Sequence, residues 1–257
     1  MGTLGWIVLF TIAGGALSAL AAGAFLLARD TTRNRLIPHL VSFATGVLLG
    51  AAFMRLLPGA FEGLGPDNVH AVGLTVLAGL LVFFLLEKLV LWRHCHHDDC
   101  DVHTGAHDHA ASGRLILIGD AMHNLVDGVL IAAAFLTDFH LGVATSVAVI
   151  AHEIPQEVGD LAILLHAGFS RLRALTLNLL VSLTSVLGGV AGYLWLDGAR
   201  AFLPYALAVA ASSFIYVAVA DLIPGMHKRV DFRSAAAQII LIMAGIGVIE
   251  ITHRFTH

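Results

Sequence analysis

The stretch that decides the fold runs from residue 114 to residue 168 and reads RLILIGDAMHNLVDGVLIAAAFLTDFHLGVATSVAVIAHEIPQEVGDLAILLHAG. It contains two apolar runs, 114–136 and 141–168, and each is long enough to cross a hydrocarbon core, which takes about 20 helical residues. Both runs nevertheless carry carboxylates and imidazoles near their middle. A charged side chain at the centre of a membrane helix costs roughly 2.5–3.5 kcal/mol even on a lenient scale. Ionisable residues at such positions therefore indicate function.

The rest of the chain has the composition of a membrane protein. Of its 257 residues, 58% are hydrophobic and 12% are charged, and the mean hydropathy is +0.87. A soluble domain carries about 25% charged residues, so this chain cannot cover a water-facing surface and lipid must be its solvent. Apolar windows of spanning length lie at about 5–28, 37–61, 70–92, 114–136, 141–168, 173–196, 202–224 and 235–253. We predict an all-α integral membrane protein with eight transmembrane helices in a single transmembrane transport domain, 1–257.

Basic residues alternate between the connecting segments, which predicts the orientation of the helices. The segments after the first, third, fifth and seventh helices contain or are flanked by bases: Arg29, Arg33, Arg35, Arg93, Arg114, Arg171, Arg173, Lys228, Arg229 and Arg233. The alternate segments 62–69 and 137–140 have none, and 197–201 has only Arg200. Both termini are therefore expected outside the cell. The cytoplasmic membrane of a bacterium is the expected location of this multi-pass protein.

The polar residues of the fourth and fifth helices are spaced so that they share helix faces. His123 and Asp127 are four residues apart, as are Glu153 and Glu157, so each pair lies on one side of its helix. His152 lies at the level of Glu153. The short connection 137–140 makes the two helices antiparallel neighbours, which brings imidazoles and carboxylates to one depth. That ligand set suits zinc, manganese, iron, cobalt or cadmium.

Further polar residues flank this cluster. Asn124 lies beside His123, and Asp120, Gln156 and Asp160 are candidates for path or auxiliary positions. Pro155 removes one helical hydrogen bond, so a bend and a free carbonyl at Ala151 are expected beside the site. Polar side chains also hold membrane helices together, and this is the alternative for any single residue. Several ionisable groups in adjoining helices, each costly to bury in the membrane, would be an unfavourable way to hold helices together. We therefore interpret them as a metal site.

The two polar motifs resemble those of the ZIP (Zrt/Irt-like) family of divalent metal transporters. The family pattern H-N-x-x-[DE]-G is matched by HNLVDG at 123–128, and H-E-[IV]-P-x-E is matched by HEIPQE at 152–157. The stretch HEIPQEVGD is similar to the subfamily whose fifth helix reads HExPHE, although Gln156 stands where that subfamily has a third histidine. The resemblance implies a ZIP-like bundle of eight helices with external termini.

The resemblance also implies the ligands. A central site would use His123, Asp127, His152 and Glu157, and a neighbouring position would use Asn124 and Glu153. The sixth helix, 173–196, lacks the glutamate with which some relatives complete a second site, and its polar residues at suitable depth are Asn178, Ser182 and Ser185. A single main ion is therefore expected.

The segment 94–113 is a hydrophilic loop that the charge pattern places in the cytoplasm. Within residues 94–109 there are six histidines, two cysteines and four aspartates, a composition typical of metal-binding tracts. We expect it to capture metal leaving the pore, using His94, Cys95, His96, His97, Cys100, His103, His107 and His109. Its spacing matches no structural zinc motif.

The sequence therefore predicts a non-enzymatic transporter that moves a divalent metal, zinc first and otherwise Cd²⁺, Fe²⁺, Mn²⁺ or Co²⁺, into the cytoplasm. The metal is cargo, and no cofactor is expected. The alternative is an intramembrane zinc metalloprotease, but the HExxH pattern of that class would need a histidine at Gln156. A metal sensor without transport is a further alternative. The lipid bilayer and metal ions are the expected partners, nucleic acid is not, and small residues of the first helix are compatible with a homodimer.

Overall fold

The computed structural model describes residues 1–25, 27–94, 107–227 and 232–254, and every regular element within these ranges is helical. Seven helical stretches of this described part are long and apolar enough to cross a membrane. They are Thr3–Phe25, Arg35–Leu64, Pro66–Leu89, Ile116–Thr137, Arg171–Asp197, Arg200–Met226 and Phe232–Thr252. The protein is thus a helical, multi-pass membrane protein.

The helices follow one another with short connections. Their bounds are α1 (Thr3–Ile12), η1 (Ala13–Leu17), α2 (Ser18–Phe25), α3 (Asp30–Ala51), η2 (Ala52–Leu56), α4 (Leu57–Leu64), η3 (Pro66–Asn68), α5 (Val69–His94), α6 (His107–Thr137), α7 (Phe139–His166), α8 (Arg171–Ser182), α9 (Thr184–Asp197), η4 (Arg200–Phe202), α10 (Leu203–Tyr216), η5 (Val217–Leu222), α11 (Ile223–Met226) and α12 (Phe232–Arg254).

The helix α7 is the predicted fifth span, and it is less apolar than the other seven. Its 28 residues would reach about 42 Å at 1.5 Å per residue, which is enough to cross a membrane. Its mean hydropathy is low because it contains five polar or ionisable residues from its midpoint onward: His152, Glu153, Gln156, Glu157 and Asp160. Half of its residues are buried by neighbouring helices, so this helix is shielded from lipid by protein. The count of eight spans stays a prediction.

The segment predicted as a loop, 94–113, is partly helical. The helix α5 continues to His94, and α6 begins at His107. An apolar window identifies only the part of a helix that lies in hydrocarbon. Ala110 and Ala111 are good helix formers, so they favour continuation of α6 outside that window. The loop is therefore shorter than predicted. Cys95, His96, His97, Cys100 and His103 lie outside the described residues.

Two helices contain a π-helical turn directly before a proline. In η2 the wide turn precedes Leu57-Pro58, and in η5 it precedes Ile223-Pro224. Proline lacks an N–H and its ring crowds the carbonyl one turn earlier, so the preceding turn opens to a π geometry. By contrast α7 passes through Pro155 as one continuous helix, so the proline there does not break it.

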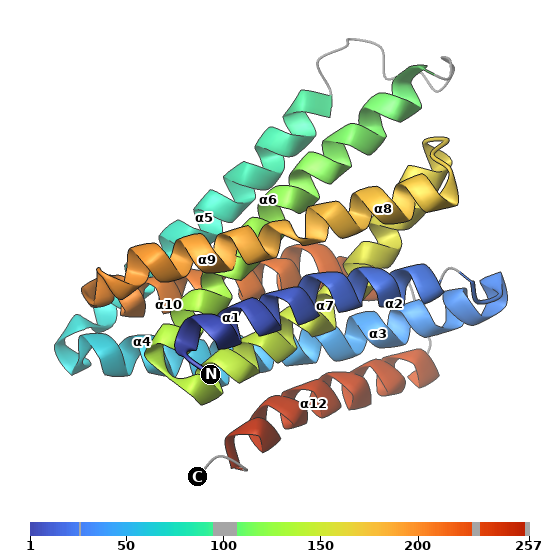
Figure 1. The fold of residues 1–257 in the computed structure, drawn as a ribbon. Coiled ribbons are helices and arrows are strands. Elements are labelled where there is room, and N and C mark those ends of the chain that lie inside the picture. Colours follow the sequence, from blue (N-terminus) through green and yellow to red (C-terminus); the bar gives the residue numbers. More distant parts are fainter. Residues whose placement is uncertain (26, 95–106, 228–231, 255–257) are drawn as a thin grey trace.

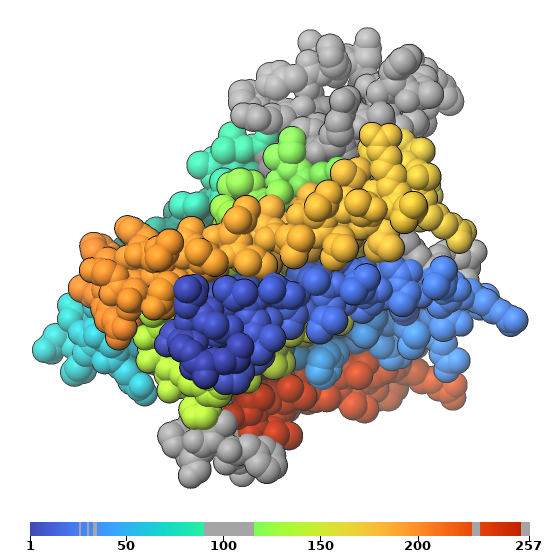
Figure 2. Space-filling view, in the orientation of Figure 1, coloured from blue at the N-terminus to red at the C-terminus, as the bar shows by residue number. Residues whose placement is uncertain are grey.

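The arrangement in space matches the alternation of basic segments (Figure 1). The N-terminus, the end of α12 and the α4–α5, α6–α7 and α9–α10 connections lie toward the left of that view. The α2–α3 and α7–α8 connections and the facing ends of α5 and α6 lie toward the right. Figure 2 shows α1–α2 and α8–α9 side by side over much of one face, in front of the middle of the bundle. These helices cover α6 and α7, with which they are in contact.

The helices α6 and α9 pack against each other along much of their length, and glycines make their close approach possible. A Cβ atom at Gly188 would lie 1.9 Å from the backbone oxygen of Leu125, and one at Gly128 would lie 1.9 Å from that of Ser185. Small residues let membrane helices meet backbone to backbone. Thr184 adds a hydrogen bond of 2.9 Å from its hydroxyl to the carbonyl of Ala121. The metal-ligand helix α6 is thus fixed against α9.

We expect Gly188→Ala to destabilise the protein, because its new methyl group would meet the backbone of α6. Overpacking of this kind costs about 1–3 kcal/mol. The matched control is Gly247→Ala in α12, where a Cβ would meet no atom within 4 Å and a helical alanine gains about 0.5–1 kcal/mol. Thermal unfolding in detergent should show a lower midpoint for the first variant and an unchanged or higher one for the second. Equal midpoints for the two would contradict the close packing of α6 on α9.

Candidate metal-ion site

The candidate site lies between α6 and α7, which are joined by the single residue Asp138. The carboxylate of Asp138 accepts hydrogen bonds from the backbone N–H groups of His140 and Leu141, at 2.9 and 3.0 Å, and so caps α7. This tight reversal makes the two helices antiparallel and adjacent. Residues early in α6 therefore lie beside residues late in α7.

Four of the predicted residues meet in one cluster, which we call the imidazole group: His123, Asp127, His152 and Glu153. The Nε2 atoms of the two histidines are 3.1 Å apart. The Oδ2 atom of Asp127 lies 3.2 Å from Nε2 of His152 and 3.8 Å from Nε2 of His123. The Oε1 atom of Glu153 lies 3.5 and 3.9 Å from the Nε2 atoms of His123 and His152, respectively. Two nitrogen and two oxygen atoms thus converge on one point.

These separations suit a tetrahedral zinc ion. Zinc bonds nitrogen and carboxylate oxygen at about 2.0–2.2 Å, which places tetrahedral ligand atoms roughly 3.3–3.6 Å from one another. The five measured separations run from 3.1 to 3.9 Å. His152, Asp127 and Glu153 are no more than 1% exposed, whereas the side chain of His123 is 22% exposed. One ligand therefore keeps a route to the surface.

His152 is oriented so that one nitrogen faces the cluster. Its Nδ1 atom lies 2.9 Å from the backbone oxygen of Ala148. A carbonyl can only accept, so Nδ1 carries a proton, and in its neutral form the ring would present the lone pair of Nε2 to the other ligands. The ring of Phe214 in α10 lies edge-on to the imidazole, with centroids 6.0 Å apart. Phe214 was not among the residues predicted from the sequence, because nothing distinguishes it from other apolar residues of its helix.

A second cluster, which we call the carboxylate group, consists of Asp120, Glu153 and Glu157, with ligand oxygens within 4.8 Å of one another. Glu153 belongs to both groups. Glu157 is held from another helix, since Nδ2 of Asn178 and the hydroxyl of Ser182 donate to its two oxygens. The structure thus brings Glu153 to the histidines and sets Glu157 one turn away, toward α8.

The remaining predicted residues surround these groups. Asn124 donates from Nδ2 to Oδ1 of Asp120 at 2.9 Å, and Gln156 reaches the same oxygen at 3.5 Å. Asp160 is half-buried and lies outside both groups. Ser185 donates to the backbone of Thr11 and Ser182, and so serves packing. The structure gives no side-chain position for His94, His107 and His109.

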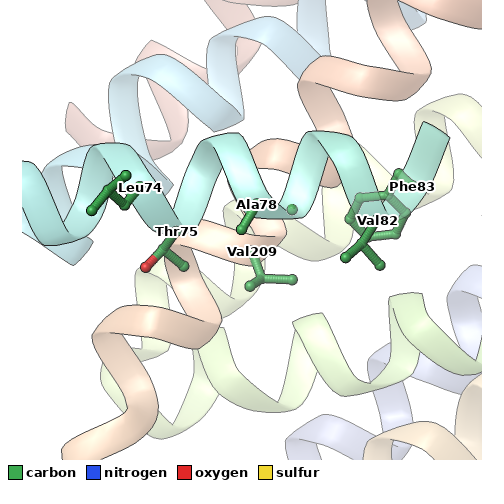
Figure 3. A pocket seen from close by; sticks show the side chains of 7 residues that line it. Leu74, Thr75, Ala78, Val82, Phe83 and Val209 are labelled. Carbon is green, nitrogen blue, oxygen red and sulfur yellow. The ribbon is translucent and has the colours of Figure 1, made fainter. Parts of the chain in front are cut away.

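An apolar groove elsewhere in the bundle is separate from this site. It lies between α5 and α10 (Figure 3). Its volume is about 370 Å³. Its lining consists of Leu74, Thr75, Ala78, Gly79, Val82, Phe83 and Val209. None of these side chains is a carboxylate or an imidazole, so the groove offers no metal ligands.

Comparison with known proteins identifies the family. The family model described as ZIP Zinc transporter matches residues 3–114 and 92–252. The chain belongs to the ZIP zinc transporter family. The zinc transporter ZIP13 of Pongo abelii is 34% identical over 233 residues, covering 85% of this chain and 67% of that protein. Human ZIP13 is 31% identical, covering 85% of this chain and 71% of its own length.

Another ZIP relative is longer than this chain. The zinc transporter ZIP4 of Rattus norvegicus is 31% identical over an alignment of 275 residues, which covers 79% of this chain but only 40% of ZIP4. The ZIP match covers α6 and α7 together with the helices that pack on them. The imidazole group therefore lies within the part of the chain that is shared with the family.

We expect Ser182→Ala to destabilise the protein, because one oxygen of the buried Glu157 would lose its donor. A lost hydrogen bond to a buried charged or polar group costs about 1–3 kcal/mol. Ser146→Ala is the matched control: Ser146 is also fully buried, but its hydroxyl donates only to the carbonyl of Gly142 in its own helix. The midpoint of thermal unfolding should fall more for Ser182→Ala. A larger fall for Ser146→Ala would mean that the contact with Glu157 contributes little.

Proposed function

We propose that this ZIP protein transports a divalent metal ion, zinc first, across the membrane into the cytoplasm through the site between α6 and α7. The observation that carries the proposal is the convergence of His123, Asp127, His152 and Glu153 at separations suited to zinc. Two carboxylates and two neutral imidazoles neutralise a divalent ion in a low-dielectric interior. The names of the zinc transporters ZIP13 and ZIP4 support zinc as the cargo. Asn124 and Glu157, also predicted as ligands, border this position.

The driving force is the gradient of the ion, the membrane potential, or a coupled proton. The sequence has no P-loop for nucleotide binding. A membrane potential contributes about 2.3 kcal/mol per charge per 100 mV, so it draws a divalent cation toward a negative interior. The metal ligands must be unprotonated to bind, so the two histidines are suited to exchange protons as the ion enters and leaves.

The topology that we propose has eight spans, with α7 as the fifth and with both termini outside. The even grouping of connections at the two ends of the bundle supports it (Figure 1). In this topology the whole of 1–257 is one transport domain in the cytoplasmic membrane of a bacterium. The segment 94–113, with its histidines and cysteines, then meets the ion on the cytoplasmic side.

The competing functions have less support. A metalloprotease would need a second histidine at the position of Gln156, and Gln156 instead faces Asp120. The matched family is one of transporters. A sensor without transport would use the same ligands, so only a measurement of flux separates it from a transporter.

The test is zinc uptake into proteoliposomes that contain the purified chain. Asp127→Ala and His152→Ala each remove a buried ligand, and uptake should fall by about tenfold or more. Glu62→Gln, an exposed carboxylate of α4, is the control and should transport like the wild type. Uptake that survives both ligand substitutions would refute the site. Zinc binding without uptake by the wild type would favour a sensor.

The side of the membrane that the segment 94–113 faces can be tested with the natural cysteines. The only cysteines of the chain, Cys95 and Cys100, both lie in the segment 94–113. A membrane-impermeant maleimide should therefore leave the protein unlabelled in intact cells and label it after permeabilisation, because the loop faces the cytoplasm. The Cys95→Ser/Cys100→Ser variant is the blank. Labelling of intact cells would reverse the proposed topology.

A further inference from the structure

Arg55 is a basic residue inside a membrane span, and the metal site between α6 and α7 does not use it. It belongs to the π-helical turn η2, nine residues before the end of the span Arg35–Leu64. At 1.5 Å per residue it lies about 14 Å from that end. The other Lys and Arg residues lie outside the seven spans or within three residues of the end of one. An arginine this far inside a span is costly and indicates a function.

The guanidinium of Arg55 has a complete edge without an acceptor. Its Nε and Nη2 atoms are buried, and neither donates a hydrogen bond. These two atoms form the side of the guanidinium that can bind both oxygens of one carboxylate. A buried donor without an acceptor is costly. We therefore expect this edge to find a carboxylate in another state of the protein.

Two carboxylates lie close enough for their charges to act on Arg55, and they belong to Glu250 and Asp138. Glu250 is part of α12, which packs backbone to backbone on α3: a Cβ atom at Gly46 would lie 2.1 Å from the carbonyl oxygen of Ile242. The helix α3 continues directly into η2. Glu250 and Arg55 are therefore held in one unit, and Glu250 offsets the charge of Arg55 in every state of that unit.

Asp138 belongs to a different part of the bundle. It is the single residue between α6 and α7, so it moves with the two ligand helices. Its Oδ1 atom accepts from two backbone N–H groups of α7, which leaves Oδ2 available to a further donor. The helix of Arg55 runs beside the start of α7, because a Cβ atom at Gly59 would lie 3.6 Å from the side chain of Leu141. A shift of α6 and α7 along η2 would therefore change the distance between Asp138 and Arg55.

We propose that Arg55 and Asp138 form an ion pair in a second state of the transport cycle, and that this pair closes the end of the bundle at the α6–α7 connection. In the structure the pair is open, because Nε and Nη2 of Arg55 have no acceptor. The π-helical geometry of η2 agrees with this role, since such turns are frequent at functional sites. The inference rests on the proposed function for the passage of an ion through this end, whereas the contact itself requires no ion.

A closing pair and a simple electrostatic barrier have opposite consequences at Asp138. If Arg55 only repelled cations, neutralising it would ease the entry of zinc, and neutralising Asp138 would hinder it. If the two residues form a closing pair, removal of either charge leaves the end open for a larger share of the time. Both changes then lower the apparent KM for zinc, because the binding site is accessible more often.

The test is the KM of zinc uptake into proteoliposomes for Arg55→Gln, Asp138→Asn and the double variant. Asparagine caps a helix as well as aspartate does, so Asp138→Asn removes the charge and keeps the start of α7. Each single variant should lower the KM by about fivefold, the effect of a partly exposed ion pair. The double variant should go no further, because both changes remove one pair. Glu62→Gln is the control and should keep the KM of the wild type.

Shifts of opposite sign in the two single variants would overturn the pair in favour of a barrier. An unchanged KM in either single variant, or fully additive shifts in the double variant, would overturn it as well.

A second measurement is independent of transport. In the Cys95→Ser/Cys100→Ser background, one cysteine is introduced by Leu141→Cys, beside Gly59, or by Leu161→Cys, about 30 Å further along α7 at 1.5 Å per residue. Both leucines are buried. In detergent, Arg55→Gln and Asp138→Asn should each raise the rate of maleimide labelling by about fivefold at position 141 and leave the rate at position 161 unchanged.

Unchanged labelling at position 141, or an equal rise at both positions, would overturn the ion pair. If the wild type carries no zinc, the proposed function is refuted, and the labelling rates still decide whether Arg55 and Asp138 form the pair.

Discussion

The burial of carboxylates that have no Lys or Arg partner among the described residues is the constraint on which the rest of the structure depends. Asp127, Glu153 and Glu157 are buried inside a bundle whose core consists mainly of apolar residues. In a medium of low dielectric constant an isolated carboxylate is prohibitively expensive. Each of these groups is therefore placed beside imidazoles, amides or hydroxyls, and the helices that supply them must approach closely.

The arrangement around α6 and α7 meets that requirement from three sides. The one-residue connection at Asp138 makes the two ligand helices antiparallel. From α8, Asn178 and Ser182 donate hydrogen bonds to Glu157. From α10, the ring of Phe214 lies edge-on to the imidazole of His152. By contrast α5 and α12 are only 11% buried over their most apolar windows. These two helices complete the apolar exterior, and the polar chemistry is confined to the middle of the bundle.

Much of this organisation could be predicted from the sequence. Apolar runs and alternating basic segments predicted the helices, and four-residue spacings placed His123 with Asp127 on one face. The same spacing could not separate Glu153 from Glu157, because both lie on one side of α7; only the rotation of α7 against α6 decides which of them meets the histidines. The π-helical turns were also not predictable, since apolar patterns do not register one extra residue per turn. Asn178 and Ser182 were visible as polar residues, but their partner Glu157 depends on packing between helices.

The close approaches of Gly128 to the backbone of Ser185 and of Gly188 to the backbone of Leu125 have a consequence for the register of the ligand helix. A slip of one residue along α6 would rotate its side chains by about 100° and turn His123 and Asp127 away from α7. Such a slip would also bring Val129 or another side chain to the place where only a hydrogen atom fits against the backbone of α9. The two glycines therefore fix the register of α6 although they contribute no ligand. They allow only the rotation of α6 at which its ligands face their partners.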